Sequence, residues 1–232
     1  MFKLKATVVA VALAASGAAQ AIVIDDTDIV VNIVRNGLSG DSMVVNTDVK
    51  AEDIFSGSVS SFTSDAALST TIFDFVDGAS DVRYWVVGRF TSGFDKFMLS
   101  NASFTDQSAV GPAVDSNIPA YITGANTDWF NASPDNYVTG IPDGDRSHFG
   151  ETNVYGNGIV NGVNLGDSYD FLYSQVGFFA GTKNGELGSW NLATNGTLSY
   201  DAVSAVPVPA AVWLFGSGLV GLVGIARRRK QA

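Results

Sequence analysis

The sequence contains no cysteine. Disulfide bonds, thiolate zinc sites, iron–sulfur clusters and thiol nucleophiles are therefore excluded for this chain. The fold must be stabilised by burial of apolar side chains rather than by covalent cross-links.

Histidine occurs once, at His148, in a segment that also contains Asp143, Asp145 and Glu151. A zinc site built on two histidines cannot form. A serine hydrolase could use His148 as its base, but no Gly-x-Ser-x-Gly nucleophile elbow is present. We therefore predict no enzymatic activity. An extracellular hydrolase with two facing carboxylates stays open as a less favoured alternative.

Positive charge is scarce between residues 22 and 205. This segment holds all 23 acidic residues but only seven of the 13 lysines and arginines, so its formal charge is −16. Such a body repels nucleic acid and anionic membrane surfaces, whereas it attracts divalent cations and basic partners. Nucleic acid is therefore excluded as a partner.

The N-terminal residues 1–21 have the features of a signal peptide. Lys3 and Lys5 precede an apolar stretch, and Ala19-Gln20-Ala21 forms a small-x-small cleavage site. The sequence thus predicts an exported protein whose mature chain begins at Ile22.

The C-terminal segment 206–232 combines a proline motif, an apolar run and four cations. As a helix, residues 208–226 would span about 28 Å, just enough to cross a bilayer. The cations of 227–230 form a basic stop and predict a cytoplasmic C-terminus. The prolines keep the motif Val206-Pro207-Val208-Pro209 extended, as a processing protease requires. One transmembrane helix and an external body are expected.

The 25 residues VPVPAAVWLFGSGLVGLVGIARRRK resemble the C-terminal sorting signal of PEP-CTERM proteins of Gram-negative bacteria. That family has a Pro-Glu-Pro motif, and Val208 stands here in place of the Glu. The resemblance implies cleavage near the motif by exosortase, a membrane protease, after transient anchoring in the inner membrane. It also implies release to the cell surface or extracellular matrix, with a role in exopolysaccharide and biofilm.

The body 22–205 is rich in short β-like runs separated by turn dipeptides. An opening hairpin is predicted from the runs 29–34 and 43–49 around Asn36-Gly37. Further strands are predicted at 70–76, 82–90, 94–104, 159–165, 169–181, 185–192 and 196–203. We predict one all-β domain, an antiparallel two-sheet β-sandwich of jelly-roll type.

The segment 105–151 interrupts this pattern with four prolines and many Asn and Asp residues. It is predicted to form long loops, where binding usually resides. Trp129 and Phe130 are the aromatic residues expected outside the core, where they could stack on sugar rings.

Calcium is the metal that suits an exported domain rich in Asp and Asn. Asp143, Asp145 and Glu151 form the most compact candidate ligand set. Asp25, Asp26 and Asp28 form a second set, and Asp128, Asp135 and Asn136 lie in the predicted loops. Asx turns use the same residue types and stay an alternative.

These observations lead to one function hypothesis and one alternative. The chain is expected to be a structural or interaction protein of the cell surface or extracellular matrix, processed by an exosortase-like enzyme. The alternative is a calcium- or carbohydrate-binding adhesion module whose ligand binds the loops of 105–151.

Overall fold

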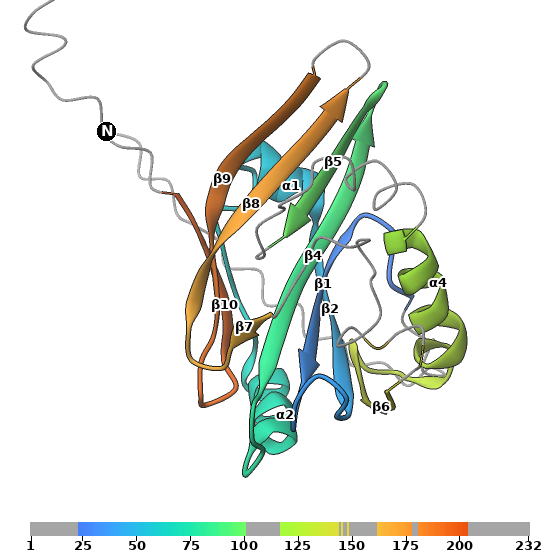
Figure 1. Ribbon diagram of the computed structural model, residues 1–232, viewed down its shortest axis with the longest axis vertical. Coiled ribbons are helices and arrows are strands. Elements are labelled where there is room, and N and C mark those ends of the chain that lie inside the picture. Colours follow the sequence, from blue (N-terminus) through green and yellow to red (C-terminus); the bar gives the residue numbers. More distant parts are fainter. Residues whose placement is uncertain are drawn as a thin grey trace, which may run out of the picture.

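The computed structural model describes residues 23–100, 117–143, 145, 148, 162–177 and 181–203 (Figure 1). The predicted signal peptide 1–21 and sorting segment 206–232 lie outside these residues. Within the described ranges, no helix is long and apolar enough to cross a membrane. The structure therefore concerns the acidic body.

The described strands form one ten-stranded sheet in the order β3-β10-β9-β8-β5-β4-β1-β2-β6, with β7 paired to β4. Every strand pair is antiparallel. The strands are β1 (Asp28–Val34), β2 (Ser42–Lys50), β3 (Ser61–Thr63), β4 (Arg83–Ser92), β5 (Asp95–Ser100), β6 (Tyr137–Ile141), β7 (Val163–Asn164), β8 (Ser168–Gly177), β9 (Gly181–Leu192) and β10 (Leu198–Ala202).

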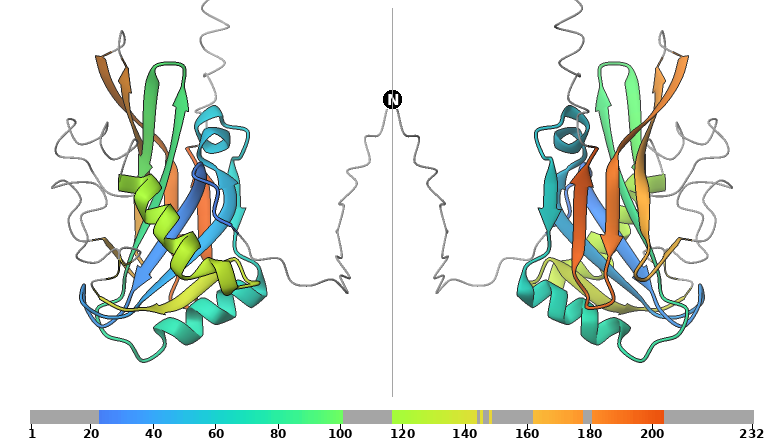
Figure 2. Two further views of the ribbon diagram at one scale, coloured as in Figure 1. Left: turned by 90° about the vertical axis from the view of Figure 1, so that its right-hand side faces the viewer. Right: turned by 90° about the vertical axis from the view of Figure 1, so that its left-hand side faces the viewer.

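The prediction of an all-β antiparallel fold is confirmed, but the described strands make one curled sheet in place of a two-sheet sandwich (Figure 2). Helices take the positions that a second sheet would occupy. They are α1 (Ala51–Ser56), α2 (Ala66–Val76), α4 (Ile118–Asp128) and the short 3₁₀ helix η3 (Phe130–Ala132).

The strand predicted at 70–76 is wrong, because these residues form the second half of α2. The Asp65 carboxylate accepts a hydrogen bond from the backbone N–H of Leu68 at 2.8 Å and caps the helix. Leu68, Ile72 and Phe75 are buried at helical spacing. The alternation of apolar residues that predicted a strand covers only seven residues, too few to separate the two periods.

The inner face of the sheet encloses the larger core. Met43 of β2 and Tyr200 of β10 belong to the same buried cluster although their strands are far apart in the sheet order, so the sheet curls around this core. Both α1 and α2 contribute apolar side chains to it. Phe55 of α1 lies between the rings of Phe97 and Tyr173, at centroid distances of 4.8 and 5.1 Å.

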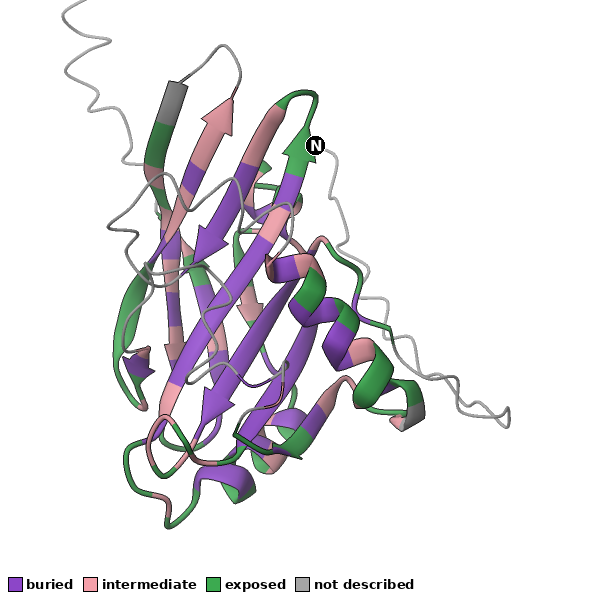
Figure 3. Cartoon of the chain, turned by 45° about the vertical axis from the view of Figure 1, so that its right-hand side comes forward, coloured by how far each residue is buried: buried purple, intermediate pink, exposed green. Residues whose placement is uncertain are grey.

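The outer face of β1, β2 and β4 carries a second core, which is covered by α4. Ile118, Tyr121 and Ile122 of the helix pack against this face. The prediction of loops throughout 105–151 is therefore wrong at α4 and β6. Pro119 lies in the first turn of α4, where a missing N–H has no cost. Because both faces are covered, all seven residues of β1 are buried (Figure 3).

The predicted hairpin around Asn36-Gly37 is confirmed by the register of the strands, and two further hairpins close at glycine-containing turns. β1 pairs with β2 around Asn36 and Gly37, whose φ angles are 62° and 88°. β4 pairs with β5 around Gly93, and β9 pairs with β10 around Asn195-Gly196. Asn and Gly adopt positive φ at low cost, which is why they occupy these hairpin turns. The hairpin turn that Lys183-Asn184-Gly185 suggests is not present, because these residues lie within β9 and pair with β8.

Candidate functional site

An acidic cleft of about 390 Å³ lies between the first turns of α2 and the segment that leads into β6. Its polar lining includes the carboxylates of Asp48, Asp65 and Asp135, and Tyr137 contributes an aromatic wall. The remaining lining residues are Ala67, Leu68, Thr71, Pro134 and Asn136. We call this feature the acidic cleft.

Hydrogen bonds of Asn46 hold two parts of the cleft lining, Asn136 and Asp48, relative to the sheet. The backbone N–H of Asn46 in β2 donates to the carbonyl of Asn136 at 2.8 Å. The Asn46 amide group donates to the Asp48 carboxylate at 3.2 Å and accepts from the Asp48 backbone N–H at 3.0 Å. Asp48 has a positive φ of 56°. The cleft is thus preformed by the fold.

The electrostatics of the acidic cleft favour a positively charged occupant. The pKa of Asp48 is raised, first by partial burial and then by the nearby charge of Asp28. A carboxylate in this situation is stabilised by any cation that approaches it. Asp65 and Asp135 add two further acidic side chains to the lining.

No three acidic or histidine side chains converge to form a metal site within the described part of the chain. The three aspartates therefore line the cleft without meeting at one point. An extended ligand with a cationic group and an apolar part fits this lining better than a single ion.

A partly buried ion pair lies next to the acidic cleft, close enough for its charges to act on Asp48. The Lys50 ammonium lies 2.7 Å from a carboxylate oxygen of Asp28 and 3.1 Å from one of Asp25. Asn46 also donates to Asp28, at 3.2 Å. Asp26, the third member of the calcium candidate at 25–28, pairs with Arg89. Cationic side chains thus occupy the positions where this part of the sequence suggested calcium.

We expect this ion pair to contribute to acid sensitivity. The pKa of Asp25 is lowered to about 2, first by the Thr27 backbone N–H and then by Lys50. A lowered folded-state pKa gives stability that is present above the unfolded-state pKa of about 4 and is lost as the pH falls towards 2. Asp25 is solvent-accessible, so the loss is at most about 1 kcal/mol.

Urea denaturation of wild type and Asp25→Asn between pH 5 and pH 2 measures this contribution. The variant should lose less stability than wild type over that range, because it has no charge to lose. Parallel curves for the two proteins would contradict the prediction.

The residues singled out in the sequence as calcium ligands are only partly described. Asp143 is exposed, and Glu151 lies outside the described residues. The Asp145 carboxylate accepts a hydrogen bond from the indole Nε1–H of Trp129 at 3.3 Å. The Nε2 of buried His148 lies 2.6 Å from the carbonyl oxygen of Gly40. His148 therefore joins its segment to the β1–β2 turn.

Of the two aromatic residues proposed to contact ligand, only Trp129 is partly exposed. Phe130 is fully buried in the core beneath α4, so the expectation that it lies outside is wrong. The physical reason is that η3 turns its ring onto the outer face of the sheet. Of these two aromatic side chains, only Trp129 is accessible to a ligand.

The residues predicted for processing cannot be placed. Ala19 and Ala21 of the signal cleavage site, and Val206 to Pro209 of the proline motif, lie outside the described residues. Their roles stay predictions.

Only some of the residues that line the acidic cleft are candidates from the sequence alone. Asp135 and Asn136 were singled out as polar residues of the 105–151 segment, whereas Asp48 and Asp65 belong to other parts of the chain. The capping role of Asp65 was the signal that could have revealed α2 and, with it, one wall of the cleft.

Comparison with known proteins identifies no relative of this chain. No family model, no curated protein and no solved structure matches this chain. Function must therefore be inferred from the residues themselves.

Proposed function

We propose that this chain is an exported, non-enzymatic interaction protein of the cell surface or extracellular matrix. The observation that carries the proposal is a preformed cleft lined by Asp48, Asp65 and Asp135 on a body with a formal charge of −16. An acidic surface of this kind suits binding of a basic or polyhydroxylated partner, such as the exopolysaccharide of a biofilm.

Delivery is the second part of the proposal. The N-terminal signal exports the chain, and the C-terminal helix holds it in the inner membrane with its end in the cytoplasm. An exosortase-like protease then cuts near Pro207 and passes the body to the surface. This part is supported by the sequence of 1–21 and 206–232.

Intact-mass analysis of protein recovered from cell envelope and medium tests this delivery. We expect mature chains that begin at Ile22 and end near Pro207. The variant Val208→Glu restores the Pro-Glu-Pro motif of the resembled family and serves as the matched control, since it should be processed at least as completely. Retention of residues 227–232 in every fraction, for both proteins, would reduce the tail to a permanent anchor.

A calcium- or carbohydrate-binding adhesion module is the second candidate. The specific observation in its favour is the partly exposed Trp129, whose indole N–H is held by Asp145. An aromatic side chain fixed in this way can stack on a sugar ring.

For this second candidate, we expect a calcium-dependent rise in the melting temperature. Calcium that binds only the folded protein stabilises it by about 2.7 kcal/mol at a hundredfold excess over its dissociation constant. Thermal unfolding with millimolar calcium, and with a chelator, measures the effect, and Asp143→Asn should reduce it. Identical melting temperatures under both conditions would count against this candidate.

A further inference from the structure

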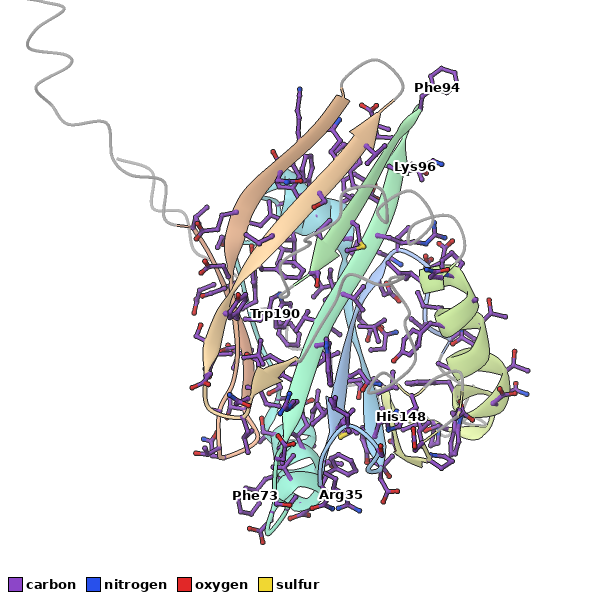
Figure 4. The ribbon with its side chains drawn as sticks, in the orientation of Figure 1. Arg35, Phe73, Phe94, Lys96, His148 and Trp190 are labelled. Atoms are coloured by element: carbon purple, nitrogen blue, oxygen red, sulfur yellow. The ribbon has the colours of Figure 1, made fainter. Side chains whose placement is uncertain are left out.

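Two rows of short polar side chains lie on the outer face of β8, β9, β10 and β3. Trp190, labelled in Figure 4, belongs to the inner core, so its neighbours Ser189 and Asn191 in β9 point to the outer face. Strand pairing extends both positions across the sheet. The first row is Thr63, Ser199, Asn191 and Ser168, and the second row is Ser61, Asp201, Ser189 and Asp170. We call these two rows the polar face.

The strands hold the polar face as a regular grid. Neighbouring strands lie about 4.8 Å apart, and alternate residues along a strand lie about 7 Å apart. A row that crosses four strands therefore spans about 14 Å. β9 pairs with β8 on one side and with β10 on the other, and β10 pairs with β3. The backbone thus fixes the positions of these groups before any ligand arrives.

The polar face is open to a ligand. The outer face of β1, β2 and β4 is covered by α4, whereas β8, β9 and β10 face the viewer in the right-hand view of Figure 2 with no helix over them. Asp170 and Asp201 are exposed. The Ser168 hydroxyl donates to the Trp190 carbonyl at 3.4 Å. Within the part of the chain that the structure describes, the other side chains of the polar face form no side-chain hydrogen bond or ion pair.

The chemistry of the polar face is that of many small hydrogen bonds. Its hydroxyl and amide groups can donate and accept, and its two carboxylates accept. Short side chains lose little conformational entropy when a ligand immobilises them, whereas lysine and arginine lose much more. Asp170 and Asp201 are separated by Ser189 in their row, so most of the grid is neutral. A ligand with regularly spaced neutral polar groups matches it.

The shape and composition of the polar face exclude several kinds of partner. A small molecule binds in a concave site, and a sheet face of this kind offers none. A protein partner needs aromatic or arginine anchors, and neither row contains one. Nucleic acid and other polyanions are repelled by the two carboxylates and by the body charge of −16. An extended neutral polymer rich in hydroxyl groups fits what is left.

We propose that the polar face binds an extended strand of neutral polysaccharide through hydrogen bonds from both rows. The inference rests on the proposed function for its extracellular setting, and it assigns the polysaccharide to a surface other than the acidic cleft or Trp129. A single contact of this kind is weak. Because a polysaccharide repeats the same groups along its length, several copies of the protein can bind one strand, and avidity then holds them in the matrix.

Co-sedimentation of the protein, as purified from the producing cells, with insoluble cellulose and chitin tests the proposal, and alginate gels serve as the anionic comparison. The blocking variant carries Ser189→Arg and Ser199→Arg, which place a long side chain in each row. The truncation variant carries Asn191→Ala and Asp201→Ala, which remove polar groups without adding volume.

The matched control carries Thr91→Arg and Thr139→Arg. Both positions are exposed strand residues outside the polar face, in β4 and β6, so this control adds the same charge as the blocking variant. Thermal unfolding verifies that each variant folds.

Wild type and the matched control should bind at least one of the two neutral polysaccharides, while the blocking and truncation variants should each bind it at least tenfold more weakly. Alginate should retard none of the proteins. Wild type that binds neither cellulose nor chitin would overturn the proposal, and so would face variants that bind like wild type.

Two further variants separate this proposal from the proposed function. Binding that is lost in Trp129→Ala or in Asp48→Asn with Asp135→Lys, but kept in the face variants, would assign the polysaccharide to those surfaces. The polar face would then be excluded while the proposed function stands. The sorting experiment fails or succeeds independently of these results, because it measures only where the chain is cut.

Discussion

Replacing Trp190 by alanine is expected to lower the free energy of unfolding by about 3–5 kcal/mol. Trp190 is fully buried in the inner core. Its ring lies 5.3 Å from that of Tyr200, 5.6 Å from that of Phe62 and 5.9 Å from that of Phe171. Removing the indole would leave a cavity where β3, β8, β9 and β10 meet.

Trp190→Phe is the matched control for this cavity. The indole Nε1–H has no hydrogen-bond partner among the described residues, so phenylalanine removes no bond that the fold uses. The control should therefore cost much less than the alanine variant when both are measured by urea denaturation. Equal losses would contradict the prediction, because they would mean that filling most of the indole volume with a smaller ring does not restore the core.

Gly196→Ala should have the second large effect, a loss of about 3 kcal/mol or more in the free energy of unfolding. Gly196 has a φ of 82°, which disfavours any residue with a Cβ. An added Cβ would also overlap the carbonyl oxygen of Ser69 and lie 2.6 Å from the backbone nitrogen of Phe73. Both obstacles are backbone atoms of α2, so they cannot move away as a flexible side chain would.

Gly57→Ala separates the overlap from the backbone strain. Gly57 has a similar φ of 77°, but an added Cβ there meets nothing within 4 Å. This variant should lose only about 1 kcal/mol, the cost of the left-handed conformation. Thermal or urea unfolding of both variants measures the difference. If the two losses were equal, the β9–β10 turn would not be packed tightly on α2.

The sequence allowed the strands to be predicted better than the helices, and the reason is local. Turn dipeptides such as Asn36-Gly37 and Asn195-Gly196 specify hairpins within a few residues. By contrast, α2 contains Thr70, Thr71 and Phe73, residue types that favour strands in isolation. Their helical conformation is decided by burial of Ile72 and Phe75 against the sheet, which is a tertiary effect.

Sequence patterns also could not predict that the strands pair into one sheet. Alternating polar and apolar residues indicate one buried face, but β1 reads as an almost continuous apolar run because it is covered on both faces. The acidic cleft was equally hidden. Asp48, Asp65 and Asp135 come from three separate segments. The pairing of β2 with β6 brings Asp48 and Asp135 together, and Asp65 reaches the cleft as the N-cap of α2.

The double coverage of β1 has a consequence for how the molecule comes apart. The inner core uses Val31 and Ile33 of this strand, and the outer core uses Val30 and Val34. β1 forms one wall of each core. If one core loses its packing, β1 is no longer held in place, and the other core is disrupted as well. The two cores should therefore melt as one cooperative unit, and local opening should be confined to elements that touch only one of them.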